Sequence, residues 1–219
     1  MDIARVRYQT VEIGDTDFHL RTLRDNQQFE DNDGIAASLG ISSATWPRFG
    51  TVWPSGERLA KLMFDYDIEG KRILEVGCGI GLASLVLNSR RADITATDYH
   101  PEAGNFLAEN AALNKGAAIP YVRADWADQN NRLGQFDLII GSDILYESDH
   151  AELLSNFINF HAKPSCTIII VDPGRSHRGR FSKLMEALGY EHPPAKTEEW
   201  EGLSQQFKGR VLYYKRTSD

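Results

Sequence analysis

The sequence predicts an α/β protein built on a doubly wound, mostly parallel β-sheet with helices on both faces. Apolar runs rich in β-branched residues recur at residues 73–76, 93–98, 136–141 and 167–171, and segments with helical spacing separate them. A glycine-rich turn at residues 77–81 follows the first of these runs directly. Because strand, glycine turn and helix in this order are typical of nucleotide-binding sheets, we expect the functional site at this turn.

The first 48 residues are expected to form an extension to this sheet. Apolar and polar side chains alternate within residues 6–23 on both sides of a turn-like stretch at 14–17, which predicts a β-hairpin outside the main sheet. Residues 32–39 have the composition of a capped short helix. The predicted organisation is therefore an extension at 1–48 and a main domain at 49–219.

A stretch rich in aromatic residues, proline and glycine joins the extension to the main domain. Two Trp-Pro pairs occur within residues 44–56, which predicts a stiff lid or wall rather than a regular element. Ser55 is suited to cap a following helix that carries Leu59, Leu62 and Met63 on one side.

The elements after the glycine turn complete the sheet and its helices. Leu82, Leu85 and Val86 predict a helix immediately after the turn, and Pro101 begins another that runs to about Asn114. The remaining elements are strand 119–123, helices 151–161 and 180–188, and a closing antiparallel pair formed by 197–200 and 206–214. With this pair the sheet has seven strands.

Composition limits the classes of protein to consider. The net charge of −7 argues against a nucleic-acid partner, because proteins that bind nucleic acids usually carry a basic face. The two cysteines, Cys78 and Cys166, have no disulfide or zinc spacing and fit a reducing compartment. No apolar run approaches the roughly 20 residues of a membrane span, and residues 1–5 do not resemble a signal peptide. We therefore expect a cytoplasmic protein without a membrane partner.

The glycine spacing indicates which nucleotide the turn binds. Gly77 and Gly79 fit the dinucleotide pattern G-x-G-x-x-G, but Leu82 stands at its third glycine position and the third glycine is Gly81. A free carboxylate at Glu75 would repel a pyrophosphate and attract a cationic amino group. S-adenosylmethionine, which carries a sulfonium and an α-ammonium, fits this loop better than a dinucleotide.

The ends of the next two strands carry further candidate binding residues. Asp98 lies 21 residues after Gly77, where a carboxylate meets ribose hydroxyls, although a turn or cap role is the alternative. The Trp126 indole is suited to stack on adenine, although a core position is equally compatible with the sequence. Asp125 either caps a turn or accepts a hydrogen bond from the adenine amino group.

The residues after strand 136–141 resemble a known enzyme family. Asp143-Ile144-Leu145-Tyr146 fits an Asp/Glu-x-x-Tyr/Phe motif, and Val52-Trp53-Pro54-Ser55-Gly56 resembles a tryptophan segment upstream of the glycine loop. Together they resemble the protein-lysine methyltransferase group of the class I, seven-strand S-adenosylmethionine-dependent methyltransferases, over residues 49–172. The resemblance implies the Rossmann-like methyltransferase fold, transfer of a methyl group to a protein lysine, and cofactor contacts at Trp53, Gly77, Gly79, Asp98, Trp126 and Ser142.

Two residues of this motif are candidates for catalysis. Asp143 would orient the methionine end of the cofactor or the incoming ammonium. Tyr146 would wall the access channel and favour a lysine cation through its ring, although a core aromatic is the alternative. The basic residues from Arg175 to Arg180 are interpreted as a solvated surface run, and binding of an acidic substrate segment is the alternative. No spacing of acidic residues indicates a metal site.

Other functions remain compatible with the same cofactor half. A small-molecule N- or O-methyltransferase would use the same loop, and a cofactor-binding partner module would bind without catalysis. A nicotinamide-dependent oxidoreductase is disfavoured by Leu82 and Glu75. The sequence gives no indication of the oligomeric state.

Overall fold

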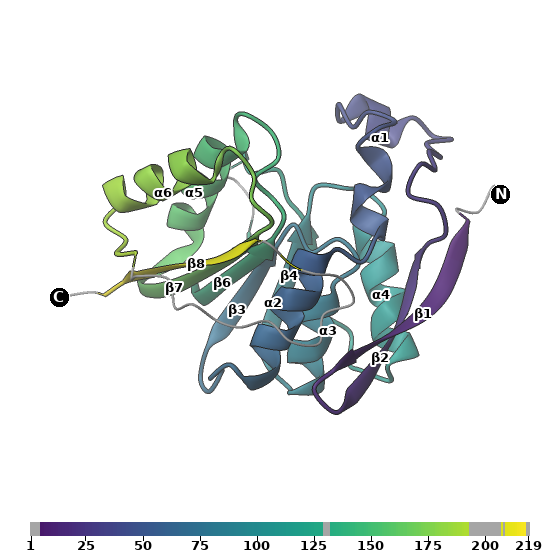
Figure 1. Ribbon diagram of the computed structural model, residues 1–219, viewed down its shortest axis with the longest axis horizontal. Coiled ribbons are helices and arrows are strands. Elements are labelled where there is room, and N and C mark those ends of the chain that lie inside the picture. Colours follow the sequence, from purple (N-terminus) through teal and green to yellow (C-terminus); the bar gives the residue numbers. More distant parts are fainter. Residues whose placement is uncertain (1–4, 129–131, 193–206, 208, 218–219) are drawn as a thin grey trace.

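The computed structural model describes residues 5–128, 132–192, 207 and 209–217, and it confirms the α/β prediction. Six strands form one sheet in the order β5-β4-β3-β6-β7-β8, in which only β8 runs antiparallel to its neighbour (Figure 1). The expected strand at 197–200 lies outside the described residues, so the described part of the sheet has six strands rather than seven. The strands are β3 (Arg72–Val76), β4 (Asp93–Asp98), β5 (Tyr121–Arg123), β6 (Phe136–Ser142), β7 (Ala162–Asp172) and β8 (Arg210–Arg216).

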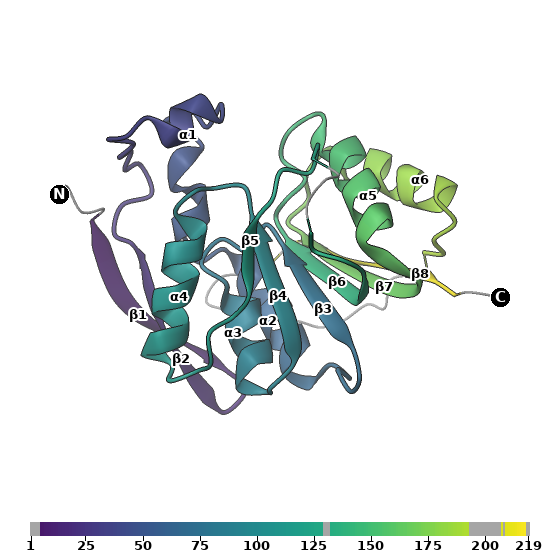
Figure 2. The same cartoon turned by 180° about the vertical axis from the view of Figure 1, so that it is seen from behind.

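Helices cover both faces of this sheet, as Figures 1 and 2 show from opposite sides. One face carries α2 (Pro54–Asp65), α3 (Leu82–Ser89) and α4 (Ala103–Leu113), and the other carries α5 (His150–His161) and α6 (Arg178–Ala187). None of the helices in the described ranges is long and apolar enough to cross a membrane.

Alternate residues of the central strands enter different cores. Ile73 and Ile140 pack on the side of α2 and α3, whereas Leu74 and Ile139 pack on the side of α5 and α6. All four side chains are fully buried. This explains why the strands appear in the sequence as continuous apolar runs, because both of their faces need apolar side chains.

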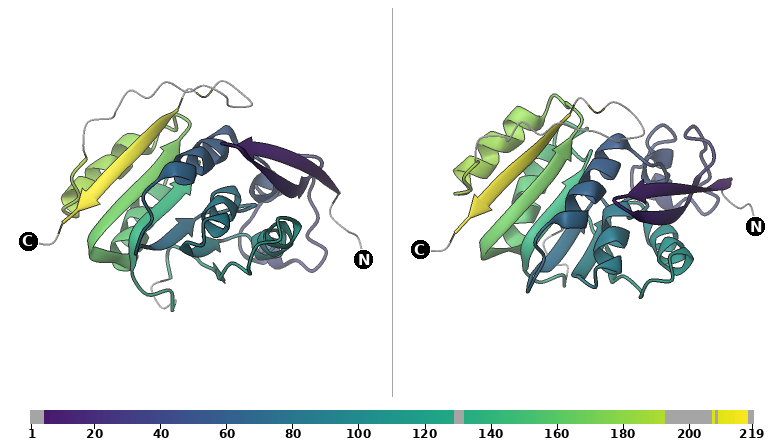
Figure 3. Two further views of the ribbon diagram at one scale, coloured as in Figure 1. Left: turned by 90° about the horizontal axis from the view of Figure 1, so that it is seen from below. Right: turned by 60° about the horizontal axis from the view of Figure 1, so that its bottom comes forward.

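The N-terminal hairpin is a separate two-stranded sheet, as predicted. Its strands are β1 (Val6–Ile13) and β2 (Thr16–Leu23), and they lie beside the helices rather than in the main sheet (Figure 3). Asn110 of α4 fixes the hairpin, since its Oδ1 accepts from the Arg21 amide at 2.7 Å and its Nδ2 donates to the Arg21 carbonyl. The same Nδ2 donates to the carbonyl of Ile80 in the glycine loop at 3.1 Å. One buried amide therefore joins the hairpin to the loop.

The segment between hairpin and sheet is more regular than the sequence predicts. After the short helix α1 (Ile35–Ser38), a 3₁₀ helix, η1, spans Trp46–Gly50, and Pro54 is the first residue of α2 rather than part of a loop. Proline fits the first turn of a helix because an N–H at that position would have no acceptor within the helix. The expected wall is therefore built from two helix starts, not from an irregular lid.

Candidate active site

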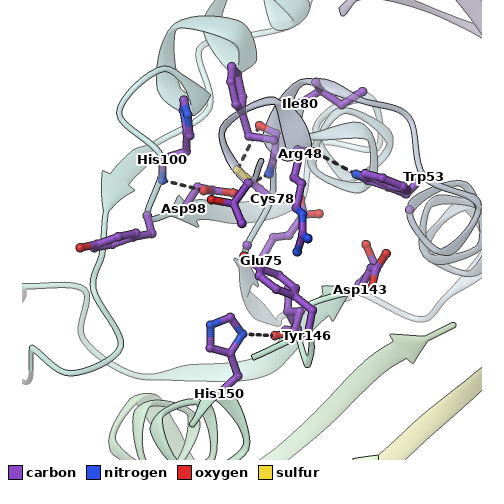
Figure 4. A pocket seen from close by; sticks show the side chains of 18 of the residues that line it. Arg48, Trp53, Glu75, Cys78, Ile80, Asp98, His100, Asp143, Tyr146 and His150 are labelled. Atoms are coloured by element: carbon purple, nitrogen blue, oxygen red, sulfur yellow. Dashed lines mark hydrogen bonds between the residues drawn. The ribbon is translucent and has the colours of Figure 1, made fainter. Parts of the chain in front are cut away.

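A pocket of about 620 Å³ opens at the carboxyl ends of β3, β4 and β6 (Figure 4). The chain continues from β3 to β4 on one side and later returns to β6 on the other, so β3 and β6 form the point at which the strand order reverses. Ligands of open α/β sheets bind at such points, since the loops diverge there. The volume suits a ligand of the size of a nucleoside derivative.

Most of the residues singled out in the sequence line this pocket. It is lined by the start of α3, the ends of β4 and β6, the Trp-Pro segment and the loop after β5. The predicted residues among its lining are Trp53, Glu75, Gly77, Gly79, Asp98, Asp125, Trp126, Ser142, Asp143 and Tyr146, whereas Gly81 is not part of the lining.

The first two glycines of the loop have no space for a side chain. Gly77 and Gly79 have φ angles of 63° and 55°, in the left-handed region that glycine adopts without strain. A Cβ at Gly77 would lie 2.6 Å from Cγ2 of Ile144, and one at Gly79 would lie 2.8 Å from the Phe49 carbonyl oxygen. The loop is therefore held close to both the β6 end and η1.

Gly81 packs closely against α4 in the structure. It is the N-cap of α3 with φ 77°, and an added Cβ would lie 2.2 Å from Cδ1 of the buried Leu107. We expect Gly81→Ala to lower the free energy of unfolding by about 2–4 kcal/mol, from backbone strain and overpacking together. Urea denaturation would measure this loss, and a ligand affinity unchanged in the folded variant would show that the effect is on packing.

Asp98 connects the end of β4 to the glycine loop. Its Oδ2 accepts from the Gly79 amide and its Oδ1 accepts from the His100 amide, both at 2.8 Å. Burial raises the pKa of the Asp98 carboxyl, while these hydrogen bonds oppose the rise. Since each carboxylate oxygen can accept a second hydrogen bond, the predicted ribose contact remains compatible with these bonds.

The Glu75 carboxylate is buried and not free, which corrects the sequence interpretation. Its Oε2 accepts from both the amide and the hydroxyl of Ser84 in α3, and the residue is 3% exposed. Burial raises the pKa of Glu75 to about 7, although the Ser84 hydrogen bonds lower it. The side chain therefore carries a charge that depends on pH close to neutrality.

The loop after β5 presents an aromatic group to the pocket. Trp126 packs edge to face on the His150 ring, with ring centroids 5.1 Å apart. Asp125 Oδ1 accepts from the Ala127 amide at 2.9 Å, which is the turn-capping role left open by the sequence. Nδ1 of His150 lies 2.8 Å from the carbonyl oxygen of Ile144, and because a carbonyl oxygen only accepts, this nitrogen is the donor.

Asp143 lies at the end of β6 in an unusual backbone conformation. Its φ of 53° is left-handed, and Nε and Nη2 of Arg175 contact its Oδ1 at 2.8 and 2.7 Å. Burial raises the pKa of the Asp143 carboxyl, while Arg175 opposes the rise. Arg175 belongs to the run interpreted as solvated surface, and for this residue that interpretation is wrong because its guanidinium reaches the pocket.

Tyr146 stands at the mouth of the pocket with 36% of its surface exposed. The Arg48 guanidinium lies over its ring at 4.8 Å from the centroid, and the His150 ring meets it edge to face at 4.6 Å. Burial of its hydroxyl raises the pKa of Tyr146 to about 12, so the phenol is neutral at physiological pH. One ring face predicted to receive a lysine cation is therefore already covered by Arg48.

Sequence reasoning missed several lining residues as parts of the site, among them Arg48, Arg175 and His150. Arg175 follows the carboxyl end of β7, a position at which sheet proteins place ligand-binding residues, so its location was a usable signal. Arg48 lies within the Trp-Pro segment and His150 four residues after Tyr146, but neither belongs to a motif that assigns it a role. Within the described residues, no group of three His, Cys, Asp or Glu side chains is arranged to hold a metal ion.

Comparisons with known proteins agree with the motif order. A family model described as lysine methyltransferase matches residues 40–187, which is more than half of the chain. Electron transfer flavoprotein beta subunit lysine methyltransferase from Mus musculus is 28% identical over 165 residues, or 72% of this chain and 64% of that protein. Protein N-lysine methyltransferase METTL21A from Danio rerio is 33% identical over 48% of this chain and 52% of that protein. The chain therefore spans less than two thirds of the length of these relatives.

Solved structures share the fold. Magnesium protoporphyrin IX methyltransferase from Synechocystis PCC 6803, solved with bound SAM, has a TM-score of 0.58 and 20% identity over 74% of this chain and 78% of that one. A 16S rRNA N2 G1207 methyltransferase from T. thermophilus, in complex with AdoMet and guanosine, has a TM-score of 0.60 and 14% identity over 98% of this chain and 51% of that one. Their different substrates show that the fold does not determine the methyl acceptor.

Proposed function

Because this chain belongs to the lysine methyltransferase family, we propose that it transfers the methyl group of S-adenosylmethionine to a lysine side chain of a protein substrate. The observation that carries the proposal is that the glycine loop and the Asp143–Tyr146 motif, 66 residues apart from Gly77 to Asp143, line one pocket. A cofactor-binding loop and a candidate acceptor site thus lie side by side.

Three observations support the fit of this cofactor to the pocket. The backbone of Gly77 and Gly79 comes close to the ligand space, and a Cβ at either residue would collide with its surroundings. The acidic residues Glu75 and Asp98 both line the pocket, and we assign Glu75 to the amino group of the cofactor and Asp98 to its ribose hydroxyls. Trp126 adds an aromatic surface suited to stack on adenine.

When bound, S-adenosylmethionine supplies a methyl group that its sulfonium already activates. The protein then has to orient the acceptor amine, exclude water and keep the amine neutral. Orientation alone can supply about 7–11 kcal/mol of the barrier. Asp143 is placed to hold the incoming ammonium, Tyr146 walls the channel, and desolvation in this channel lowers the amine pKa.

The proposal is tested by incubating the purified chain with labelled S-adenosylmethionine and a cell lysate. We expect label in protein bands, and acid hydrolysis of these bands to yield methyl-lysine. Label confined to small molecules would replace the proposal by a small-molecule methyltransferase, and methyl-histidine would change the acceptor. Calorimetric binding of S-adenosylmethionine without transfer to any lysate component would favour the non-catalytic alternative.

A further inference from the structure

The charges that line the pocket are not balanced. Among the described lining residues there are two arginines and no lysine, but five acidic residues, namely Glu75, Asp98, Asp125, Asp143 and Asp149. Arg175 is one of these arginines, and it is already paired with Asp143. The other, Arg48, has no ion pair with a carboxylate in the described part of the chain, although its guanidinium is exposed to the pocket.

The Arg48 backbone is firmly held while its guanidinium remains available. Arg48 is the exposed position of η1 between the buried residues Pro47 and Phe49. Its carbonyl oxygen accepts from Nε1 of Trp53 at 2.9 Å. Figure 4 shows the side chain extending across the pocket toward Tyr146. Contact with the face of a ring leaves the in-plane N–H donors of a guanidinium free for a planar anion.

S-adenosylmethionine carries two cationic groups and one anionic group, its α-carboxylate. The acidic lining accounts for the cationic groups, and the carboxylate needs a cation that is not already neutralised. We propose that Arg48 binds the methionine carboxylate of the cofactor, with Trp53 as the positioning residue that fixes the Arg48 backbone. This inference rests on the proposed function and names a binding residue that no sequence motif contains.

The pairing has a consequence for the acceptor site. Arg48 lies over the Tyr146 ring, so a carboxylate that binds the guanidinium neutralises a cation next to the lysine channel. The acceptor lysine would otherwise approach an unpaired like charge. Cofactor binding therefore prepares the channel for a cationic side chain, which favours binding of the cofactor before the protein substrate.

The test is calorimetry of the full chain with S-adenosylmethionine and with decarboxylated S-adenosylmethionine, which keeps the sulfonium and amine but lacks the carboxylate. For the unmodified protein we expect the decarboxylated ligand to bind about 10- to 100-fold more weakly, as for loss of a charge-assisted pair. Arg48→Gln is expected to weaken S-adenosylmethionine binding by a similar factor and to leave the decarboxylated ligand nearly unaffected. The two ligands would then bind the variant within about threefold of each other.

Arg123→Gln is the matched control, because Arg123 is an exposed arginine at the end of β5 that does not line the pocket. It should preserve the preference for the carboxylated ligand. An equal loss of affinity for both ligands in Arg48→Gln would overturn the inference. Unchanged affinity for both ligands would overturn it as well, because the guanidinium would then not bind the cofactor carboxylate. Failure of both ligands to bind the unmodified chain would instead reject the proposed function.

Discussion

Asp143→Asn is expected to slow methyl transfer by about 100-fold while the protein remains folded. Asparagine tolerates the left-handed backbone that residue 143 adopts, and its amide oxygen can still accept from Arg175. Because Arg175 is partly exposed and can be hydrated, the free energy of unfolding should fall by no more than about 1 kcal/mol. The substitution removes the negative charge that we propose holds the acceptor ammonium, so KM for the protein substrate should rise as kcat falls.

Comparison with Asp143→Ala separates the effect of the lost charge from the effect of backbone strain. Alanine removes the same charge but also strains the left-handed backbone, at a cost of about 1–2 kcal/mol. Single-turnover kinetics and thermal unfolding of both variants would resolve the two effects. Turnover in Asp143→Asn equal to that of the unmodified protein would remove Asp143 from the catalytic assignment.

Glu75→Gln is expected to make the protein more stable and less able to bind its cofactor. The Glu75 pKa rises from 4.5 to about 7 on folding, so the ionised carboxylate lowers the free energy of unfolding by about 3 kcal/mol above pH 7. Glutamine removes this cost and keeps an oxygen that accepts from Ser84. It also removes the charge that we propose attracts the cofactor amino group, so the affinity for S-adenosylmethionine should fall at least about tenfold.

The raised pKa of Glu75 predicts how the free energy of unfolding changes with pH. Between pH 4.5 and 7 the folded protein holds more protons on Glu75 than the unfolded chain, so this group makes stability fall as pH rises through that window. The two proteins should therefore have similar stability below pH 4.5 and differ most above pH 7. Chemical denaturation at pH 4, 6 and 8 measures this, and a stability difference that is constant with pH would contradict the raised pKa.

The sequence was sufficient for those parts of the fold that depend on local patterns. Both faces of the central strands are buried, so Ile73, Leu74, Ile139 and Ile140 form apolar runs that are recognisable without a structure. Gly77 is recognisable for a similar reason, because a left-handed turn beside a strand end excludes other residues. The hairpin was also predicted correctly, since two-residue alternation around a turn is a short-range feature.

The missed parts of the site depend on contacts between residues distant in the sequence. Arg175 pairs with Asp143 across 32 residues, and Arg48 reaches Tyr146 across 98 residues, and neither contact leaves a local pattern. A run of exposed arginines looks the same whether or not one of them turns inward. The burial of Glu75 was missed for the same reason, because Ser84 contacts the Glu75 carboxylate only when α3 packs on β3.

The Asn110 amide gives the N-terminal hairpin a part in events at the pocket. It is fully buried and hydrogen-bonds at once to β2 and to the glycine loop, so neither can shift without breaking a bond in a site that water does not reach. Coupling between two sites is reciprocal. If the docked hairpin strengthens ligand binding at the loop, a bound ligand therefore stabilises the docked hairpin by the same free energy. Slower hydrogen exchange of the β2 amides would thus report ligand binding in the pocket, and a factor that loosens the hairpin would weaken that binding.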